Sequence, residues 1–213
     1  MTVGICGLGL IGGSMAKAYK ASGHRVLGFD IDQATLGYCD LAGITDGVLD
    51  ESTIGECELL FVALYPTASA HYLESVAHLI SKDATVIDLC GTKVKICECG
   101  FALAKKHGFG IEIAEFCTPW FLDTDFAGID PNIREKLSCS DRFVLHAPFS
   151  ELFPCAIDPK VRAIAAERYR QVIRVAEGYG IRKIVVHGGY NPRIYFPIWY
   201  TEQSVLFWKK FLQ

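Results

Sequence analysis

Short apolar runs alternate with longer segments of helical period along the whole chain. Runs rich in β-branched residues predict strands, and segments whose apolar residues recur every three or four positions predict helices. Alternation of this kind is typical of an α/β fold with a mainly parallel sheet covered by helices. The expected strands are Val3–Cys6, Arg25–Phe29, Leu59–Leu64, Thr85–Leu89, Ile111–Phe116, Phe143–His146 and Lys183–His187. The expected helices are Ile11–Ser22, Ala68–Ser81, Lys93–His107, Pro159–Tyr179 and Trp199–Leu212.

A GFG segment, Gly108–Gly110, separates an expected helix from an expected strand. Glycines at such a junction interrupt regular secondary structure and are typical of a domain boundary. We therefore expect two domains, residues 1–108 and 109–213. The strand Ile111–Phe116 can extend the sheet of the first domain as a sixth strand, or it can begin a body that folds by itself. The residues leave both arrangements open.

A GxGxxG pattern lies directly between the first expected strand and the first expected helix. In that setting the first glycine permits a tight turn, the second lets backbone approach a pyrophosphate, and the third lets helix and strand pack closely. The unpaired N–H groups at the start of the helix would bind the phosphate charge. The cofactor-binding residues expected in this turn are Gly7, Leu8, Gly9, Leu10, Ile11 and Gly12.

Asp30 ends the second expected strand, eighteen residues after Gly12. A carboxylate at this place can accept hydrogen bonds from both adenosine ribose hydroxyls and repel a 2′-phosphate, which favours NAD over NADP. The first domain is therefore expected to be a Rossmann-type doubly wound domain that binds a dinucleotide. The alternative is a glycine-rich turn that binds no ligand, with Asp30 capping the next helix.

The segments VGICGLGLIGGSMAKAYKASGHRVLGFDID, LLFVALYPTAS and TVIDLCGTKVKI resemble the nucleotide-binding domain of prephenate dehydrogenases. The resemblance covers about half of the chain and implies an NAD(P)-dependent oxidoreductase of tyrosine biosynthesis. It also implies that the nicotinamide ribose passes the turns after the fourth and fifth strands. The residues implied there are Ala63, Leu64, Tyr65 and Thr67 in the first turn, and Gly91, Thr92 and Lys93 in the second.

After KKHGF the chain departs from that family. The family continues with a GGHPMAG-like segment, whose histidine accepts the substrate hydroxyl proton, and with a helical dimerisation domain. Neither is present in this sequence, and His107 ends an expected helix instead. We therefore expect cofactor binding with weak or absent prephenate turnover, and we assign no catalytic residue.

The segments IEIAEF, RFVLHAPF, DPKVRAIAAERYRQVIRVAEGYGIRKIVVHGGYNP and SVLFWKKFL resemble sugar phosphate isomerases and apurinic endonucleases, which are metal-dependent TIM-barrel enzymes of the xylose isomerase type. The resemblance implies about three βα units of a barrel, with metal ligands at His146 and His187, each at the carboxyl end of an expected strand. Glu115 is a looser ligand candidate, and Asn191 is expected on the same loop face. Imidazole ligands suit zinc or manganese.

Three βα units cannot close a barrel, and a catalytic zinc usually has three protein ligands. In the alternative interpretation, His146 and His187 are structural residues that bond to backbone or carboxylate groups. The aromatic residues of this half either line a ring-stacking pocket or belong to its core. The chain as a whole then looks like a chimera of two partial enzymes, and a non-catalytic fusion protein is a third hypothesis.

The formal net charge of -3 gives no overall attraction for nucleic acid or for an anionic membrane. Met1 leads directly into the first expected strand without a secretory leader, and no apolar run approaches about 20 residues, so we expect a cytoplasmic protein. The nine cysteines are expected to be reduced, mostly buried thiols. The expected partners are a dinucleotide, a small-molecule substrate and, through unfinished sheet edges, a second copy of the chain.

Overall fold

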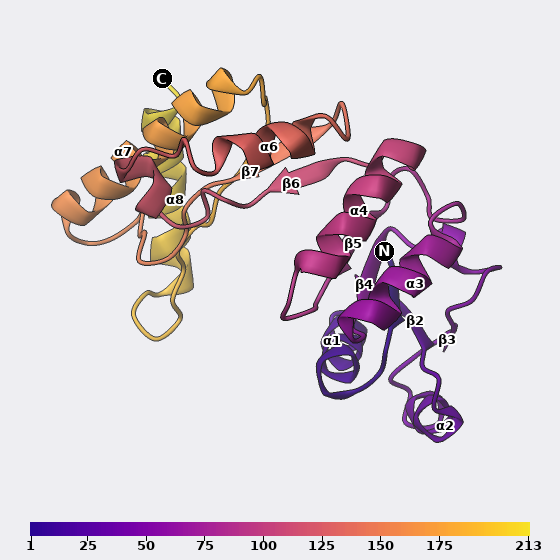
Figure 1. Cartoon of the computed structure of the whole chain (residues 1–213). Coiled ribbons are helices and arrows are strands. Elements are labelled where there is room, and N and C mark those ends of the chain that lie inside the picture. Colours follow the sequence, from indigo (N-terminus) through magenta and orange to yellow (C-terminus); the bar gives the residue numbers. More distant parts are fainter. The chain divides into compact units, whose positions relative to one another are not determined.

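The structure is a computed structural model that describes all 213 residues. The chain forms two compact units, Met1–Phe109 and Gly110–Gln213, with the boundary inside the GFG segment. Figure 1 draws the first unit in indigo to magenta and the second in pink to yellow. Each unit has its own parallel sheet and its own apolar core.

The first unit contains a five-stranded parallel sheet in the order β3-β2-β1-β4-β5. Its strands are β1 (Thr2–Cys6), β2 (Arg25–Phe29), β3 (Gly47–Val48), β4 (Leu59–Val62) and β5 (Thr85–Asp88). Its helices are α1 (Leu10–Ala21), α2 (Gln33–Leu41), α3 (Pro66–Val76) and α4 (Val94–His107), and a short 3-10 turn, η1, covers Ile54–Glu56. The chain reverses direction across the sheet beside β1, and in open α/β sheets ligands bind at the carboxyl ends of the strands at such a point.

Two apolar layers cover the two faces of this sheet. Alternate side chains of β1 and β4, among them Val3, Ile5 and Phe61, pack on one face with residues of α1 and α2. Leu60 and Val62 point to the other face and pack with residues of α3 and α4, which lie side by side in Figure 1. Helices on both faces make this unit a Rossmann-type doubly wound domain, as the sequence predicts.

Strand β5 forms one edge of the sheet and is less covered than its neighbours. The side chains of Val86 and Ile87 are 36% and 37% exposed, whereas the central strands β1 and β4 are almost fully buried. The outer backbone groups of β5 have no partner strand in this sheet.

The second unit contains a three-stranded parallel sheet in the order β6-β7-β8. Its strands are β6 (Ile111–Ile113), β7 (Phe143–His146) and β8 (Ile184–Val185), and its helices are α5 (Trp120–Asp123), α6 (Asp130–Leu137), α7 (Pro159–Gly178) and α8 (Pro197–Phe211). Ile113 and Leu145 pack on one face with Tyr169 and Val172 of α7. Asp158 caps α7 by accepting a hydrogen bond from Lys160 N–H at 2.7 Å.

Strand β6 hydrogen-bonds to β7 and begins a second sheet, so it is not the sixth strand of the first sheet. The three strands of the second sheet form an open sheet, not a closed barrel. The structure also contains elements that the sequence pattern did not predict: α2, β3, η1, α5 and α6. All nine cysteines are free, and six of them are buried. No helix has both the length and the apolar character needed to cross a membrane.

Candidate functional site

The glycine turn between β1 and α1 has no room for a side chain at two of its three glycines. Gly7 has φ +91°, and a Cβ atom there would lie 2.6 Å from the carbonyl oxygen of Ala63. A Cβ atom on Gly12 would lie 1.8 Å from the carbonyl oxygen of Gly7. By contrast, a Cβ atom on Gly9 would meet nothing within 4 Å. The first and third glycines are therefore required by the packing of the turn, and the second faces open space.

Asp30 lies directly after β2 and faces this turn. The backbone N–H of Leu8 donates to its Oδ2 at 2.8 Å, and the backbone N–H of Asp32 donates to its Oδ1 at 3.0 Å. Each carboxylate oxygen has capacity for a further hydrogen bond. The two hydrogen bonds fix the carboxylate beside the glycine turn.

A second carboxylate, that of Asp32, lies two residues further on and caps α2. It accepts hydrogen bonds from the hydroxyl of Thr35 at 2.7 Å and from the backbone N–H groups of Ala34 and Thr35, each at 3.2 Å. The Thr35 hydroxyl and these amides hold the pKa of Asp32 below its usual value. The end of β2 therefore carries a second anionic group, two residues after Asp30.

A hollow of about 600 Å³ opens beside the glycine turn and extends between α1 and α2. It begins at Leu8 and Gly9 and reaches Ile44, and its lining includes the ammonium-bearing residue Lys17 and the hydroxyl-bearing residue Ser14. The open space beside Gly9 is therefore part of a larger depression that is accessible from the solvent.

The residues expected after β4 follow that strand at the carboxyl edge of the sheet, where the glycine turn also lies. They are Ala63, Leu64, Tyr65 and Thr67. Ala63 N–H donates to Cys6 O at 2.8 Å, which ties this turn to the end of β1. The Cys90 thiol donates to Leu64 O at 3.2 Å, and the ammonium group of Lys95 donates to the Thr67 hydroxyl at 3.2 Å. Tyr65 O accepts from Ser69 N–H at 2.8 Å, and the residue is largely exposed. These hydrogen bonds connect the turns after β1, β4 and β5.

The residues expected after β5, Gly91, Thr92 and Lys93, are all exposed. The ammonium group of Lys93 is not free, because it pairs with Asp88 Oδ2 at 2.6 Å. Burial alone would raise the pKa of Asp88, but hydrogen bonds from Cys90 and Lys93 bring it below its usual value. Lys93 therefore forms an ion pair with Asp88, which the sequence pattern did not predict.

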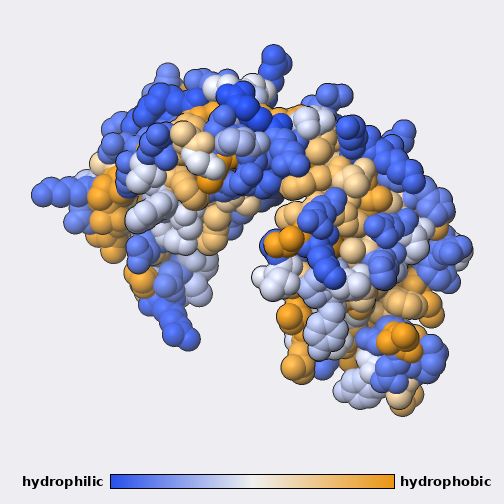
Figure 2. Space-filling view, viewed as in Figure 1, coloured by the Kyte–Doolittle hydropathy of each residue, from blue (hydrophilic) through white to orange (hydrophobic).

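Several exposed apolar side chains surround the crevice. Figure 2 shows hydrophobic residues among hydrophilic ones on the surface. Leu10, Ile31, Tyr65 and Val94 follow β1, β2, β4 and β5, and their exposed fractions range from 73% to 94%. Because the strands are parallel, all four residues lie at the carboxyl edge of one sheet. This edge offers apolar contacts beside the hydrogen-bonding groups of the glycine turn and Asp30.

In the second unit, the structure brings His146 and His187 together. Their Nε2 atoms are 2.8 Å apart, and Phe149 packs against both rings at centroid distances of 5.4 and 4.7 Å. Nδ1 of His146 lies 2.5 Å from Oε1 of Glu112. A carboxylate can only accept, so Nδ1 carries the proton, and in neutral His146 the Nε2 atom accepts from Nε2–H of His187.

Glu115, the third residue expected as a metal ligand, does not lie with these histidines in the structure. Its Oε1 pairs with the ammonium group of Lys136, while its Oε2 is buried without a partner. No group of three or more His, Cys, Asp or Glu side chains in the chain is arranged to hold a metal ion. The expected loop residue Asn191 accepts a hydrogen bond from Arg193 N–H at 2.9 Å. The carboxylate that contacts His146, Glu112, was missed by the sequence pattern.

The first unit matches a known protein family. The sequence model described as the nucleotide-binding domain of prephenate dehydrogenase matches residues 15–109, which begin just after the GxGxxG turn.

An uncharacterized protein of Methanocaldococcus jannaschii is 35% identical over 68 residues, which cover 30% of this chain and 23% of that protein. The alignment with this curated relative therefore covers about a quarter of its length.

Two of the matching solved structures are dehydrogenases, with low sequence identity to this chain. The Synechocystis arogenate dehydrogenase has 19% sequence identity and a TM-score of 0.48, with 100% of this chain and 86% of that chain covered. The A. aeolicus prephenate dehydrogenase, solved in complex with hydroxyphenyl propionate and NAD+, has 18% identity and a TM-score of 0.45, with 84% of this chain and 87% of that chain covered. The family model thus matches most of the first unit and no residue of the second. No comparison supports a sugar phosphate isomerase or TIM-barrel assignment for the second unit.

Proposed function

We propose that residues 1–108 bind NAD in the crevice at the carboxyl ends of β1, β2 and β4. The observation that carries the proposal is the hydrogen bond from Leu8 N–H to Asp30, which sets the carboxylate beside the glycine turn. The open space at Gly9 gives a pyrophosphate access to the backbone at the N-terminus of α1. The exposed side chains Ile31 and Tyr65 supply apolar contacts for flat rings.

Two carboxylates, those of Asp30 and Asp32, support NAD over NADP. Asp30 accepts from the ribose hydroxyls, and both groups repel the additional phosphate of NADP. The nearest cation in the adjoining hollow, Lys17, makes no ion pair, but it lies on α1 and not at the end of β2. The proposed order of affinity is therefore NAD first and NADP second.

The proposed reaction class is that of a prephenate dehydrogenase-type oxidoreductase, with weak or absent turnover by this chain. Bound NAD supplies a hydride acceptor, and the chain's own groups must then remove the substrate proton. His107 is a poor base for this task, because α4 ends there after running back from the carboxyl edge of the sheet. Its ring stacks on Phe109 at 5.7 Å instead. Cofactor binding without efficient hydride transfer follows from this arrangement.

Calorimetric titration of the full chain with NAD and with NADP tests the proposal. We expect a one-to-one complex with NAD and a markedly weaker one with NADP. An absence of heat and of thermal protection at millimolar NAD would contradict the binding proposal. A prephenate oxidation assay with NAD separates binding from turnover, and rapid NADH formation would contradict only the second part.

A second function rests on one observation, the 2.8 Å separation of the Nε2 atoms of His146 and His187. In this proposal the two imidazoles hold zinc or manganese, and the second unit is a fragment of a metal-dependent sugar phosphate isomerase or apurinic endonuclease. Two nitrogens on one tetrahedral zinc are about 3.3 Å apart, so the rings need to separate only slightly. Glu112 would fix the ring of His146 in the required tautomer.

Zinc titration followed by metal analysis after gel filtration tests this second function. We expect His146→Asn and His187→Asn each to abolish retention of zinc, and Glu112→Gln to weaken it by about 10- to 100-fold. Glu115→Gln is the matched control, because that carboxylate pairs with Lys136 and not with the histidines. Zinc retention that is equal in the wild type and in both histidine variants would reject the site.

A further inference from the structure

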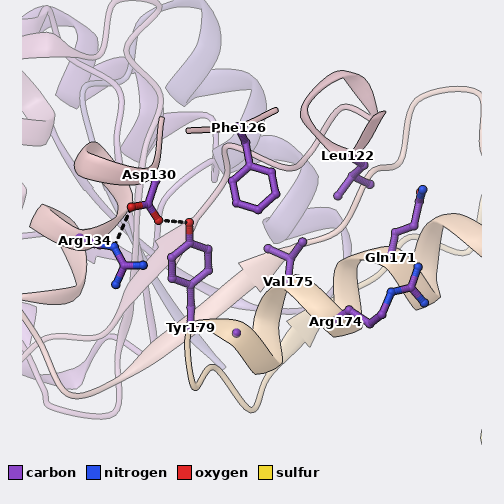
Figure 3. A pocket seen from close by; sticks show the side chains of 9 residues that line it. Leu122, Phe126, Asp130, Arg134, Gln171, Arg174, Val175 and Tyr179 are labelled. Atoms are coloured by element: carbon purple, nitrogen blue, oxygen red, sulfur yellow. Dashed lines mark hydrogen bonds and ion pairs between the residues drawn. The ribbon is translucent and has the colours of Figure 1, made fainter. Parts of the chain in front are cut away.

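The second unit has a surface hollow of about 460 Å³ between α5, α6 and the C-terminal half of α7 (Figure 3). Neither histidine and no residue of the nucleotide site lines it. Its volume lies within the range of small-molecule sites, which combine apolar walls with a few placed polar groups. The lining residues are Leu122, Phe126, Asp130, Arg134, Gln171, Arg174, Val175, Gly178 and Tyr179.

The floor of the hollow is apolar and supported from behind. Leu122, Phe126 and Val175 are partly buried side chains that pack against the core of the second unit. The ring of Phe126 meets Phe116, a fully buried residue, edge to face with centroids 5.6 Å apart. The floor is therefore held in place by the core and offers a firm apolar surface to a ligand.

One end of the hollow carries a fixed polar group of three side chains. The Tyr179 hydroxyl donates to Asp130 Oδ1 at 2.7 Å, and Arg134 Nε donates to Asp130 Oδ2 at 2.7 Å. The guanidinium carbon of Arg134 lies 5.7 Å from the centre of the Tyr179 ring. Figure 3 shows both hydrogen bonds at this end of the row of side chains. Arg134 is thus oriented before any ligand arrives.

The charges around the hollow favour an anion. Asp130 uses one oxygen for each of its two partners, and Arg134 uses only its Nε, so the terminal amino groups of Arg134 remain available. Arg174, which lies at the far end of the row from Arg134 in Figure 3, is exposed and forms no ion pair. Two guanidinium groups against one carboxylate leave the lining with a formal charge of about +1.

We propose that this hollow binds a small carboxylate that has an aromatic or branched apolar body. The carboxylate accepts hydrogen bonds from the terminal amino groups of Arg134, a geometry in which a guanidinium recognises carboxylates well. The apolar body lies on Phe126 and Val175, and Arg174 adds attraction from the far end. Nothing in this proposal depends on the nucleotide site or on the histidine pair.

Phenylacetate and its neutral analogue phenylacetamide test the proposal on the full chain by calorimetry and ligand-observed NMR. For a ligand of this size we expect the hollow to bind phenylacetate with a dissociation constant of roughly 10 mM or tighter. We expect it to bind phenylacetamide at least about tenfold more weakly. Equal binding of the two compounds, or no phenylacetate binding at 10 mM, would overturn it.

Three arginine variants locate the site. We expect Arg134→Gln to weaken phenylacetate binding about tenfold or more and Arg174→Gln to weaken it by about threefold. Arg170→Gln is the matched control, since Arg170 lies on the same helix as Arg174 but stacks over Phe211, outside the hollow. Arg134→Gln also removes the hydrogen bond to Asp130, so the melting temperature of this variant is measured in parallel. If Arg134→Gln unfolds, Arg174→Gln still tests the proposal. Unchanged affinity in Arg174→Gln, or equal losses in Arg170→Gln and Arg174→Gln, would refute the assignment.

Discussion

The backbone N–H of Leu8 donates a hydrogen bond to the carboxylate of Asp30 at 2.8 Å. This contact joins the residue after the first glycine of the turn to the residue after β2, across 22 positions of sequence. One hydrogen bond thus connects the expected phosphate site to the expected ribose site. The choice between NAD and NADP is expected to depend on this relationship.

Replacing Asp30 with Asn should change cofactor choice. The amide keeps an acceptor for Leu8 but loses the charge that binds ribose hydroxyls and repels a 2′-phosphate. We expect the ratio of the dissociation constants for NADP and NAD to fall by about tenfold or more, as measured by calorimetry. Asp32→Asn makes the same change in charge two residues away and still caps α2, so it should alter the ratio much less. An equal effect of the two variants would show that general charge, and not the position of Asp30, decides.

Two glycines of the turn should respond differently to Ala. A Cβ atom at Gly9 meets no protein atom within 4 Å, and the φ of Gly9 is -65°, which suits alanine. Gly9→Ala should therefore leave the melting temperature nearly unchanged and weaken NAD binding about tenfold or more, because the methyl group occupies the approach of the pyrophosphate. Gly12→Ala should lower both, since its Cβ atom would lie 1.8 Å from Gly7 O. Wild-type NAD affinity in Gly9→Ala would argue against a pyrophosphate at this turn.

A substitution in the apolar core of one unit should leave the other unit folded. Leu145 is 0% exposed in the second unit, and Leu145→Ala should cost about 2 to 5 kcal/mol of the free energy of unfolding. NAD affinity should stay at the wild-type value, because Leu145 packs only within the second core. Leu60→Ala, a matched deletion in the core of the first unit, should impair both stability and NAD binding. Urea unfolding combined with NAD titration checks both variants, and loss of NAD binding in Leu145→Ala would contradict the separation.

Stability should depend on pH through Asp46. A hydrogen bond from Lys20, followed by one from Val26 N–H at 2.8 Å, holds the pKa of Asp46 below its usual value. A carboxyl group with a lowered folded-state pKa stabilises the protein above its unfolded-state pKa of about 3.9, and this contribution is lost as the pH falls through the folded-state pKa. Asp46→Asn should therefore destabilise the protein most near neutral pH, and the difference from wild type should shrink below about pH 4.

Thermal unfolding of wild type and Asp46→Asn between pH 3 and pH 7 measures this effect. Asp40→Asn is the control, because Asp40 lies on α2 and its exposed side chain forms no ion pair. A difference between wild type and Asp46→Asn that does not change with pH would contradict the linkage.

The first unit could be predicted from sequence because its signals are local. The glycine turn and Asp30 are defined by spacing alone, and the strand Arg25–Phe29 has the predicted bounds. α2 was missed although Asp32 is a good cap, because the helix has only nine residues and includes a glycine. β3 has two residues and exists through its pairing with β2, which no local pattern encodes.

The second unit depends more on partners that are distant in sequence. Ile111 pairs with Phe143, 32 positions further along the chain, and not with the first sheet. The register of this pairing explains the choice of carboxylate near the histidines. Glu112 lies opposite Val144, on the strand face that also carries His146, whereas Glu115 follows the end of β6 and pairs with Lys136. The alternation of side chains along Ile111–Ile113 would have predicted Glu112 as the carboxylate near His146 if the pairing of β6 with β7 had been known.

The exposed border of the first sheet has a consequence for handling the protein. Strand β5 offers a row of main-chain donors and acceptors, and Val86 and Ile87 beside it are only partly covered. Any extended segment can add to such a row and bury those side chains at the same time. A lysine in place of Val86 or Ile87 should therefore reduce self-association of this protein at high concentration.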